Sequence, residues 1–406
     1  PTGFAYSERT SSWGHTAPSG VLFGVWDRQG YVRLDSGGGD ISIKGKSANG
    51  TPGFAWRGDD TDIPIINAGD GSVSIVGEST SGHGIELNYY SGNHSPLIQS
   101  SSDADVAISV IGSTDASAGY QGIATMVSSG DGGIYLEGAS GSGAAGWDIW
   151  FPGGGLYAAS GDITIVGAGP GQTGVVDVTL GTGSLGVTSS SDIVIKSDRL
   201  EDDDVRTIQT TGSLSFLPYS DSGFAQSFSI STKTTLSNTL SGLVIGDANN
   251  TSNVAISREF AVAGPISMYG NYIWIYDDLE TTTSGSDVLV KSHGVGGVNG
   301  YIVLESGSSI TTNGGDIILW SNAANVSSGA ANSEISFSSG SSLSSAGGAI
   351  VLAGGLDPAA DRRAAPSALG RGRSGRTALA LAGGVRLIPR RLAPGACGAA
   401  LHSRAR

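Results

Sequence analysis

A short sequence repeat recurs along most of the chain, and it limits the folds that are available to it. Each copy begins with a turn of Gly, Ser or Asp and continues with two apolar residues that flank one further residue. Clear copies are Gly39–Ile43, Gly71–Ile75, Gly161–Ile165, Ser191–Ile195 and Asp287–Val290. The alternation has the two-residue period of a β-strand, and Ile and Val favour that conformation. The repeat therefore predicts many short strands joined by tight turns.

The spacing of the copies indicates how the strands are arranged. Ile134, Ile163 and Ile193 follow one another at nearly equal intervals. The copies between Val288 and Ile350 follow one another at about half that interval. Both sets fit a coil of roughly 20 to 30 residues that contains two or three strands. We therefore predict an all-β chain folded as a parallel β-helix, or β-solenoid, in which the apolar residues of successive coils stack.

Composition supports this prediction and excludes other folds. Gly accounts for 66 of the 406 residues. Because Gly costs about 1 kcal/mol per helical position relative to Ala, a helical protein is excluded. The glycines lack the three-residue period of collagen, and the clusters of Ile, Val and Leu argue against a disordered body. We expect Gly and Asp at the corners between strands, because both tolerate positive φ and Asp can bond the backbone two residues further on.

Charge divides the chain into unlike segments. Residues 1–356 contain 12 basic and 34 acidic residues, a net charge of −22, whereas residues 357–406 contain ten Arg and two Asp, a net charge of +8. We predict an irregular or strand-forming N-terminal segment at 1–35, a solenoid domain at 36–356 and a tail at 357–406. The abrupt change to Arg, Ala, Gly and Pro favours an out-of-frame product or a disordered, poorly structured tail over a tail that binds nucleic acid.

The start of the chain and its hydropathy are also informative. The sequence begins at Pro1 and shows neither a signal peptide nor an apolar run near the roughly 18 residues of a membrane-spanning helix. We expect an internal fragment of a longer protein, with no transmembrane segment.

Residue types that support catalysis are sparse. The body, residues 1–356, holds five Lys, and its histidines form no short-spaced metal pair. Gly37–Ile41 is similar to one copy of a calcium-binding nonapeptide that acts only in tandem, and Glu201–Asp204 has the character of a solvated acidic loop. We expect no catalytic residues, no cofactor and no metal site. Carboxylates on adjacent coils nevertheless leave a β-helical carbohydrate-active enzyme open as an alternative.

Two short motifs are weak candidates for binding. Arg57, Gly58 and Asp59 form the Arg-Gly-Asp tripeptide that some adhesins use, and the residues around it suggest a turn. Trp147 and Trp150 would provide a surface on which sugars stack, although packing against neighbouring coils explains the same alternation and is favoured.

Several stretches resemble the repeats of filamentous haemagglutinin-like adhesins. They are Val262–Gly270, Ile273–Ile275 with Asp287–Lys291, Ile310–Ser321 and Gly347–Gly355. The resemblance covers Ser36 to Leu356 loosely and is best from Leu243 to Leu356. The chain departs from the family in lacking an N-terminal secretion domain and a C-terminal effector.

The resemblance implies a right-handed β-helix in a large bacterial exoprotein, located extracellularly or at the cell surface. It also implies attachment or aggregation without catalysis, through host-cell or neighbouring-cell partners such as glycans or protein receptors. An outer-membrane transporter is an expected partner only if a secretion domain exists outside this sequence. The alternative is a phage tailspike-like protein or another β-helical protein that acts on or binds polysaccharide.

Overall fold

A computed structural model of the chain confirms the all-β prediction. It describes residues 20–23, 32–48, 50–58, 65–89, 96–141, 149–168, 177–185, 190–201, 206–221, 223–294, 300–321, 334–354, 379–382, 385–389 and 401–405. Within these ranges the regular elements are all strands, and the pairings described between β1 and β34 are parallel. The chain groups into two compact units, unit 1 (Pro1–Ser213 and Lys233–Thr235) and unit 2 (Leu214–Thr232 and Leu236–Arg406).

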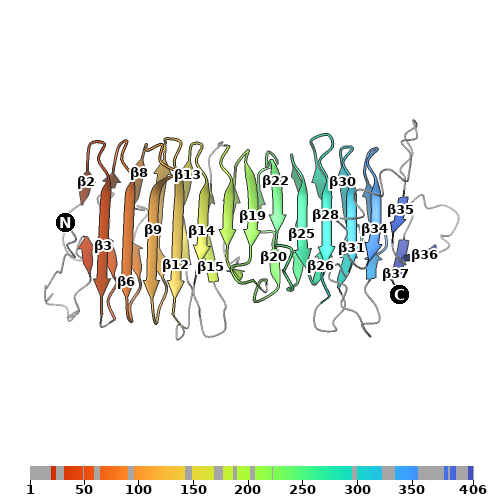
Figure 1. Cartoon of the computed structure of the whole chain (residues 1–406), viewed down its shortest axis with the longest axis horizontal. Coiled ribbons are helices and arrows are strands. Elements are labelled where there is room, and N and C mark those ends of the chain that lie inside the picture. Colours follow the sequence, from red (N-terminus) through yellow and green to blue (C-terminus); the bar gives the residue numbers. More distant parts are fainter. Residues whose placement is uncertain are drawn as a thin grey trace. The chain divides into compact units, whose positions relative to one another are not determined.

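The coils of unit 1 have three faces, and on the first of these the strands lie side by side (Figure 1). This face contains β3 (Ile41–Ser47), β6 (Val73–Ser79), β9 (Val106–Thr114), β12 (Gly133–Ser140), β14 (Ile163–Gly167) and β16 (Ile193–Lys196). The second contains β1 (Val21–Phe23), β4 (Phe54–Gly58), β7 (Ile85–Tyr89) and β10 (Tyr120–Gly122). The third contains β2 (Arg33–Asp35), β5 (Ile65–Asn67), β8 (Leu97–Ser100) and β11 (Ala124–Ser128). The long strand β13 (Ile149–Ala158) continues both of the last two faces, and it pairs with β15 (Asp177–Leu185), which pairs in turn with β17 (Arg199–Glu201) and β18 (Arg206–Ile208).

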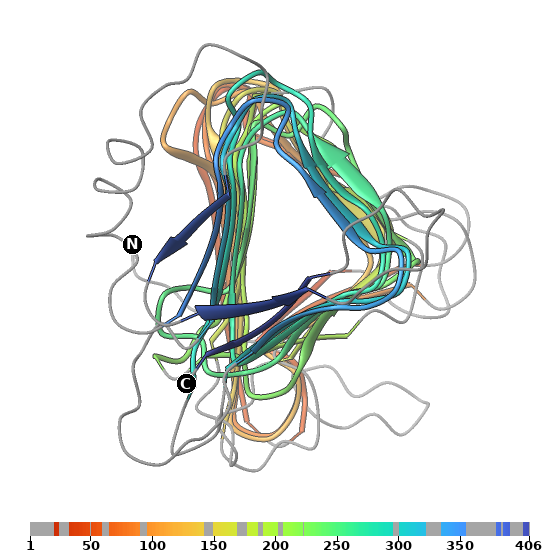
Figure 2. The ribbon, with the colours of Figure 1, turned by 90° about the vertical axis from the view of Figure 1, so that its right-hand side faces the viewer.

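Unit 2 has the same design, and its coils trace a three-sided outline when viewed end-on (Figure 2). Its first face contains β22 (Gly242–Ile245), β25 (Ile266–Gly270), β28 (Val288–Ser292), β31 (Ile317–Ser321) and β34 (Ile350–Gly354). The second contains β20 (Phe228–Ile230), β23 (Val254–Ile256), β26 (Tyr272–Ile275), β29 (Tyr301–Leu304) and β32 (Glu334–Phe337). The third contains β24 (Phe260–Val262), β27 (Leu279–Thr281), β30 (Ser309–Thr312) and β33 (Ser342–Ser344). Two further strands, β19 (Ser213–Leu217) and β21 (Thr234–Leu236), lie near the boundary between the units in sequence.

The predicted tail contains the last described strands, β35 (Leu379–Ala382), β36 (Val385–Pro389) and β37 (Leu401–Ala405). Strand β35 pairs parallel with β34, whereas β37 pairs antiparallel with β36 and β32. In the N-terminal segment, β1 pairs in register with β4 and β2 with β5. The predicted boundaries at residues 36 and 357, and the predicted nature of the tail, remain predictions.

The predicted apolar stacking forms the core of each unit. In unit 1, Ile134 pairs with Ile163, and Ile163 pairs with Ile193, so each of the two predicted intervals is a single coil. In unit 2, Val288 pairs with Ile317, whereas Ile302 lies on the next face, which explains the shorter intervals. All of these side chains are at most 1% exposed. Each buried aliphatic side chain of this size contributes about 1.5–3 kcal/mol to the free energy of unfolding.

Coil length varies more widely than the sequence predicts. Ile266 pairs with Val288 in a short coil, whereas Val73 pairs with Ile108 in a coil that is longer by more than half. Register is nevertheless kept along most of the strands, because a shift of one residue would turn every apolar side chain outward. One extra residue, Ala107, forms a bulge in β9 where it pairs with β12. Most of the extra residues therefore lie at the corners.

Glycine has two structural roles in the coils. Turn glycines such as Gly37 have the predicted positive φ, and a second group serves another purpose. Gly45, Gly77 and Gly112 stack in register at buried positions, and none of them has a positive φ. A Cβ at Gly112 would lie 2.0 Å from the carbonyl oxygen of Gly119, the residue that precedes β10 on the second face. A Cβ at Gly45 or Gly77 would likewise lie 2.0 or 2.1 Å from the corresponding carbonyl oxygen of the next segment. Close approach of two backbone segments therefore requires these glycines.

Substitution of Gly112 by Ala is expected to destabilise unit 1. The added methyl group overlaps a backbone carbonyl that accepts a hydrogen bond from the Ile85 N–H. We therefore expect a loss of about 1–3 kcal/mol in the free energy of unfolding. Gly39→Ala is the matched control, because its Cβ would have no heavy atom closer than 3.9 Å. Urea unfolding followed by circular dichroism measures both, and equal midpoints for the two variants would refute the close-approach argument.

Candidate functional site

The Arg-Gly-Asp tripeptide begins inside a strand and not in a turn. Arg57 and Gly58 are the last residues of β4, and their backbones pair in register with Asn88 and Tyr89 of β7. Asp59 lies outside the described residues. Trp56, the preceding residue, is 2% exposed and packs edge-on against Phe23. The tripeptide's role in adhesion therefore remains a prediction.

The predicted sugar-stacking pair is described only in part. Trp150 lies in β13, where its backbone pairs with Gln121 of β10 and Thr179 of β15. Trp147 lies outside the described residues. Stacking on sugars and packing against neighbouring coils both remain predictions for these two residues.

Strands β3, β6, β9 and β12 of the first face of unit 1 end in hydroxyl side chains, which form a ladder at the corner. Ser47, Ser79, Thr114 and Ser140 stand in register and are 4–7% exposed. The Ser79 Oγ donates to the carbonyl oxygen of Thr51 at 2.7 Å and accepts from the Gly82 backbone N–H at 2.8 Å. These hydroxyls satisfy backbone groups that a buried corner would otherwise leave unpaired.

A shallow depression of about 250 Å³ lies over the same corner. Its lining includes Lys46, Glu78 and Asp115 beside the hydroxyl ladder. The Lys46 Nζ lies 2.8 Å from the Glu78 Oε2, and both side chains are about half exposed. An exposed pair of this kind is worth roughly 0.2–1 kcal/mol, so it contributes little to stability. The depression is small, and its hydroxyl ladder serves the fold.

Aspartates at the start of the first-face strands connect each coil to the next. The Asp40 Oδ1 accepts from the Ser72 backbone N–H at 2.8 Å and from the Ser72 hydroxyl at 3.0 Å, and these bonds hold the pKa of Asp40 below its usual value. In unit 2, the Asp287 Oδ1 accepts from the Asp316 N–H, and the Asp316 Oδ1 accepts from the Ala349 N–H, both at 2.7 Å. The bonds to the backbone two residues further on that the sequence predicts occur at other turns, whereas these aspartates bond the backbone one coil away.

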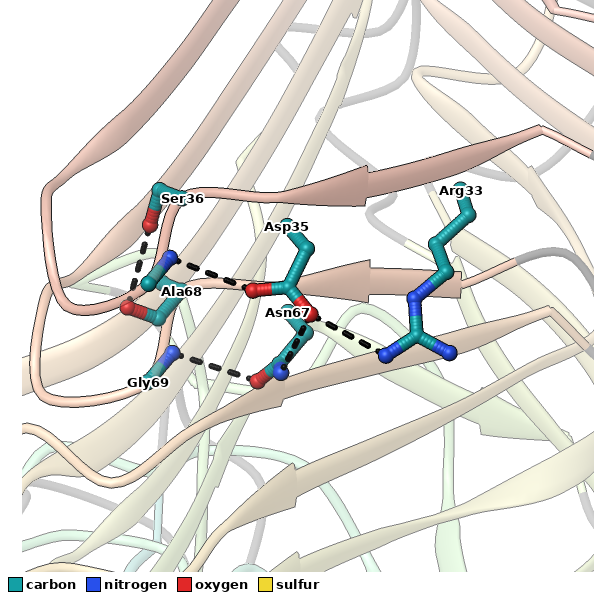
Figure 3. A network of polar contacts seen from close by, with 7 residues as sticks. Arg33, Asp35, Ser36, Asn67, Ala68 and Gly69 are labelled. Atoms are coloured by element: carbon teal, nitrogen blue, oxygen red, sulfur yellow. Dashed lines mark hydrogen bonds and ion pairs between the residues drawn. The ribbon is translucent and has the colours of Figure 1, made fainter.

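A second polar network lies at the turn that was compared with a calcium-binding repeat (Figure 3). The Asp35 carboxylate accepts from Arg33 at 3.0 Å, from the Gly37 N–H at 3.1 Å and from the Asn67 amide at 3.3 Å. The hydrogen bond from Arg33 is the main reason that the pKa of Asp35 lies below its usual value. The carboxylates on either side of Gly37–Gly39, those of Asp35 and Asp40, thus already accept hydrogen bonds from groups of the protein. This favours a structural role for the turn.

An outward-facing group of aromatic side chains lies on the second face of unit 2. Tyr272 and Trp274 alternate with buried Ile273 and Ile275 along β26, and Tyr276 follows the strand. The Tyr272 ring stacks on Trp274, with centroids 5.5 Å apart and planes 18° apart, and on Tyr301 of the next coil at 4.8 Å and 22°. Burial first, and the nearby Tyr301 second, raise the pKa of Tyr272. We name Tyr272, Trp274, Tyr276 and Tyr301 the aromatic face.

The aromatic face is not among the candidate sites predicted from the sequence. Ile273–Ile275 contributes there only to the resemblance to adhesin repeats. The usable pattern was the alternation of Tyr272, Trp274 and Tyr276, which places all three side chains on one side of a strand. The stacking with Tyr301 depends on register between coils, which sequence spacing does not provide here.

Three acidic residues gather at a neighbouring corner of unit 2. One carboxylate oxygen from each of Glu259, Asp277 and Asp278 lies within 4.8 Å of the others. Glu259 and Asp278 are exposed, and the Asp278 Oδ1 accepts from the Ser309 hydroxyl at 2.7 Å. Such clusters are common on solvated surfaces.

Comparison with known proteins identified no relative: no protein-family model, curated protein or solved structure matches the chain. Among the described residues, no helix is long and apolar enough to cross a membrane.

The buried His293 is expected to make unit 2 sensitive to mild acid. It is 6% exposed, and burial is the main reason that its pKa lies below the usual value. A hydrogen bond between its ring and the Asn250 carbonyl opposes this effect on the pKa, and Lys291 adds to it. The unfolded chain takes up this proton near pH 6.5, whereas the folded chain resists protonation. Stability is therefore greatest above pH 6.5 and decreases as the pH falls below it.

Replacement of His293 by Gln is expected to reduce this pH dependence. Urea midpoints measured at pH 7.5 and 5.5 should differ for the parent protein and differ less for His293→Gln. An unchanged difference between the two pH values in the variant would contradict the assignment.

Proposed function

We propose that this chain is a structural stalk and adhesive repeat region of a secreted or cell-surface bacterial adhesin, and that it mediates attachment or aggregation without catalysis. The observation that carries the proposal is the continuity between coils, in which backbone ladders and aspartate side chains bond each coil to the next. A stack of this kind is stabilised mainly by contacts between neighbouring coils. Further coils can therefore be added without any change in the contacts within the existing ones. This property suits an adhesin, which needs binding surface along many successive coils.

The placement of polar groups supports a mechanical role over turnover of a substrate. The carboxylates of Asp35 and Asp40 and the hydroxyl of Ser79 all bond to protein groups. A catalytic acid or base must instead reach a substrate proton. These side chains are better explained as parts of the scaffold.

Attachment of coated beads tests the proposal. Fluorescent beads that carry the full 406-residue chain are expected to bind cultured cell layers, or to aggregate, several-fold more than beads that carry albumin. Asp59→Glu beads test the tripeptide in the same assay, because the variant keeps the charge and lengthens the side chain. Loss of binding in this variant would assign the contact to the tripeptide. Unchanged binding would exclude the tripeptide as the point of contact.

A turnover assay tests the enzymatic alternative. The same chain is incubated with soluble polysaccharides, and new reducing ends are measured. We expect none. Release of reducing ends, or binding and aggregation no greater than with albumin, would contradict the proposal and favour a carbohydrate-active protein or another role.

A further inference from the structure

We propose that the aromatic face binds an uncharged polysaccharide, whose sugar rings stack on Trp274 and Tyr276. This inference rests on the proposed adhesive function, because it names the chemical class of ligand that the adhesive surface recognises. It concerns a different site from the Trp147 and Trp150 pair.

The position of the rings indicates a binding role. Ile273 and Ile275 already fill the interior at 0% exposed, so the alternate aromatic residues are not needed to build the core. Tyr276 is 49% exposed, and among the described residues only Val106 and Tyr219 are other large hydrophobic side chains in the exposed class. Exposed aromatic residues of this kind are typical of recognition surfaces, where one side of the ring is apolar and its edge is polar.

The neighbouring residues leave room beside the rings. Trp274 pairs in register with Ala255 on the preceding coil, and Ala255 pairs with Ser229 on the coil before that. Tyr276 follows Ser257 in the same way, since the Tyr276 N–H donates to Ile256 and the Ser257 N–H donates to Ile230. Small side chains therefore form a low surface next to a raised row of aromatic rings. A pyranose ring has space to lie there with the C–H groups of one face against an aromatic side chain.

The charges beside the rings select the ligand class. Tyr301 pairs with Glu334, and the backbone N–H of Glu305 bonds to Ile275, so two carboxylate-bearing residues stand next to the aromatic face on the following coils. Ionised carboxylates only accept hydrogen bonds, and sugar hydroxyl groups are donors. The body carries a net charge of −22 from its 12 basic and 34 acidic residues. Sulfated or uronic-acid polysaccharides are therefore repelled, whereas neutral ones are not.

Affinity electrophoresis of the full chain tests the inference. Gels contain hydroxyethyl cellulose, mannan or laminarin as neutral probes, and heparin or polygalacturonate as acidic probes. At least one neutral probe is expected to retard the parent protein, and neither acidic probe is. Trp274→Ala and Tyr276→Ala are each expected to weaken the retardation at least tenfold, whereas Trp274→Phe keeps most of it because a flat ring remains.

Tyr219→Ala is the matched control, since it removes a tyrosine that is 39% exposed in the same unit but outside the aromatic face. It should retain full retardation, and circular dichroism should show that all variants are folded. The inference is overturned if no neutral probe retards the protein, if heparin retards it more strongly, or if Trp274→Ala is retarded as strongly as the parent.

The bead assay separates this failure from failure of the proposed function. Beads whose attachment is unchanged by Trp274→Ala, together with no retardation by neutral probes, overturn the glycan inference and leave adhesion standing. If retardation depends on Trp274 but the beads neither attach nor aggregate, glycan binding by the aromatic face is supported and the proposed adhesive function is overturned.

Discussion

The close approach of two backbone segments at one corner is the constraint on which unit 1 most depends. Where the first face turns into the second, a strand and the segment that follows the turn pass so near to each other that a Cβ at Gly112 would lie 2.0 Å from a carbonyl oxygen. The same contact recurs at Gly77 and Gly45, one coil apart each time. Because the glycines stack in register, each coil repeats the path of its neighbour, and the apolar ladders inside them align as a consequence.

Side chains then connect the coils that the backbone has aligned. Asp40, Asp287 and Asp316 each accept a backbone N–H from the following coil. At the opposite end of the strand, hydroxyl groups such as that of Ser79 bond both the turn that follows the strand and the corresponding turn of the preceding coil. These polar bonds satisfy groups that the sharp corners remove from the strand ladders, and they leave the outer sides of the strands free to vary.

Sequence reasoning predicted the parts of this architecture that depend on local pattern. The alternation at Ile134, Ile163 and Ile193 predicted inward stacking and the length of those coils, because side-chain direction in a strand follows from spacing alone. It did not predict that Gly112 is needed for close approach, since the distance between two backbone segments depends on how the coil closes. The aromatic face was missed for a similar reason: Tyr272 and Tyr301 lie on successive coils and meet only through register. The candidates that remain at the level of sequence are Arg57, Gly58, Asp59, Trp147 and Trp150.

The variation in coil length has an evolutionary consequence. The short coil from Ile266 to Val288 and the long coil from Val73 to Ile108 preserve the same alternation of inward and outward side chains. Insertions and deletions at the corners therefore change the surface without disturbing the interior. A single residue inserted within a strand would turn its remaining side chains over unless a bulge accommodates it, as Ala107 does in β9. A lineage of such proteins is free to exchange whole corner segments while its strands change slowly. Its surface chemistry would then diverge faster than its fold, and repeats of the same origin would keep their strand pattern after their corner segments had ceased to resemble one another.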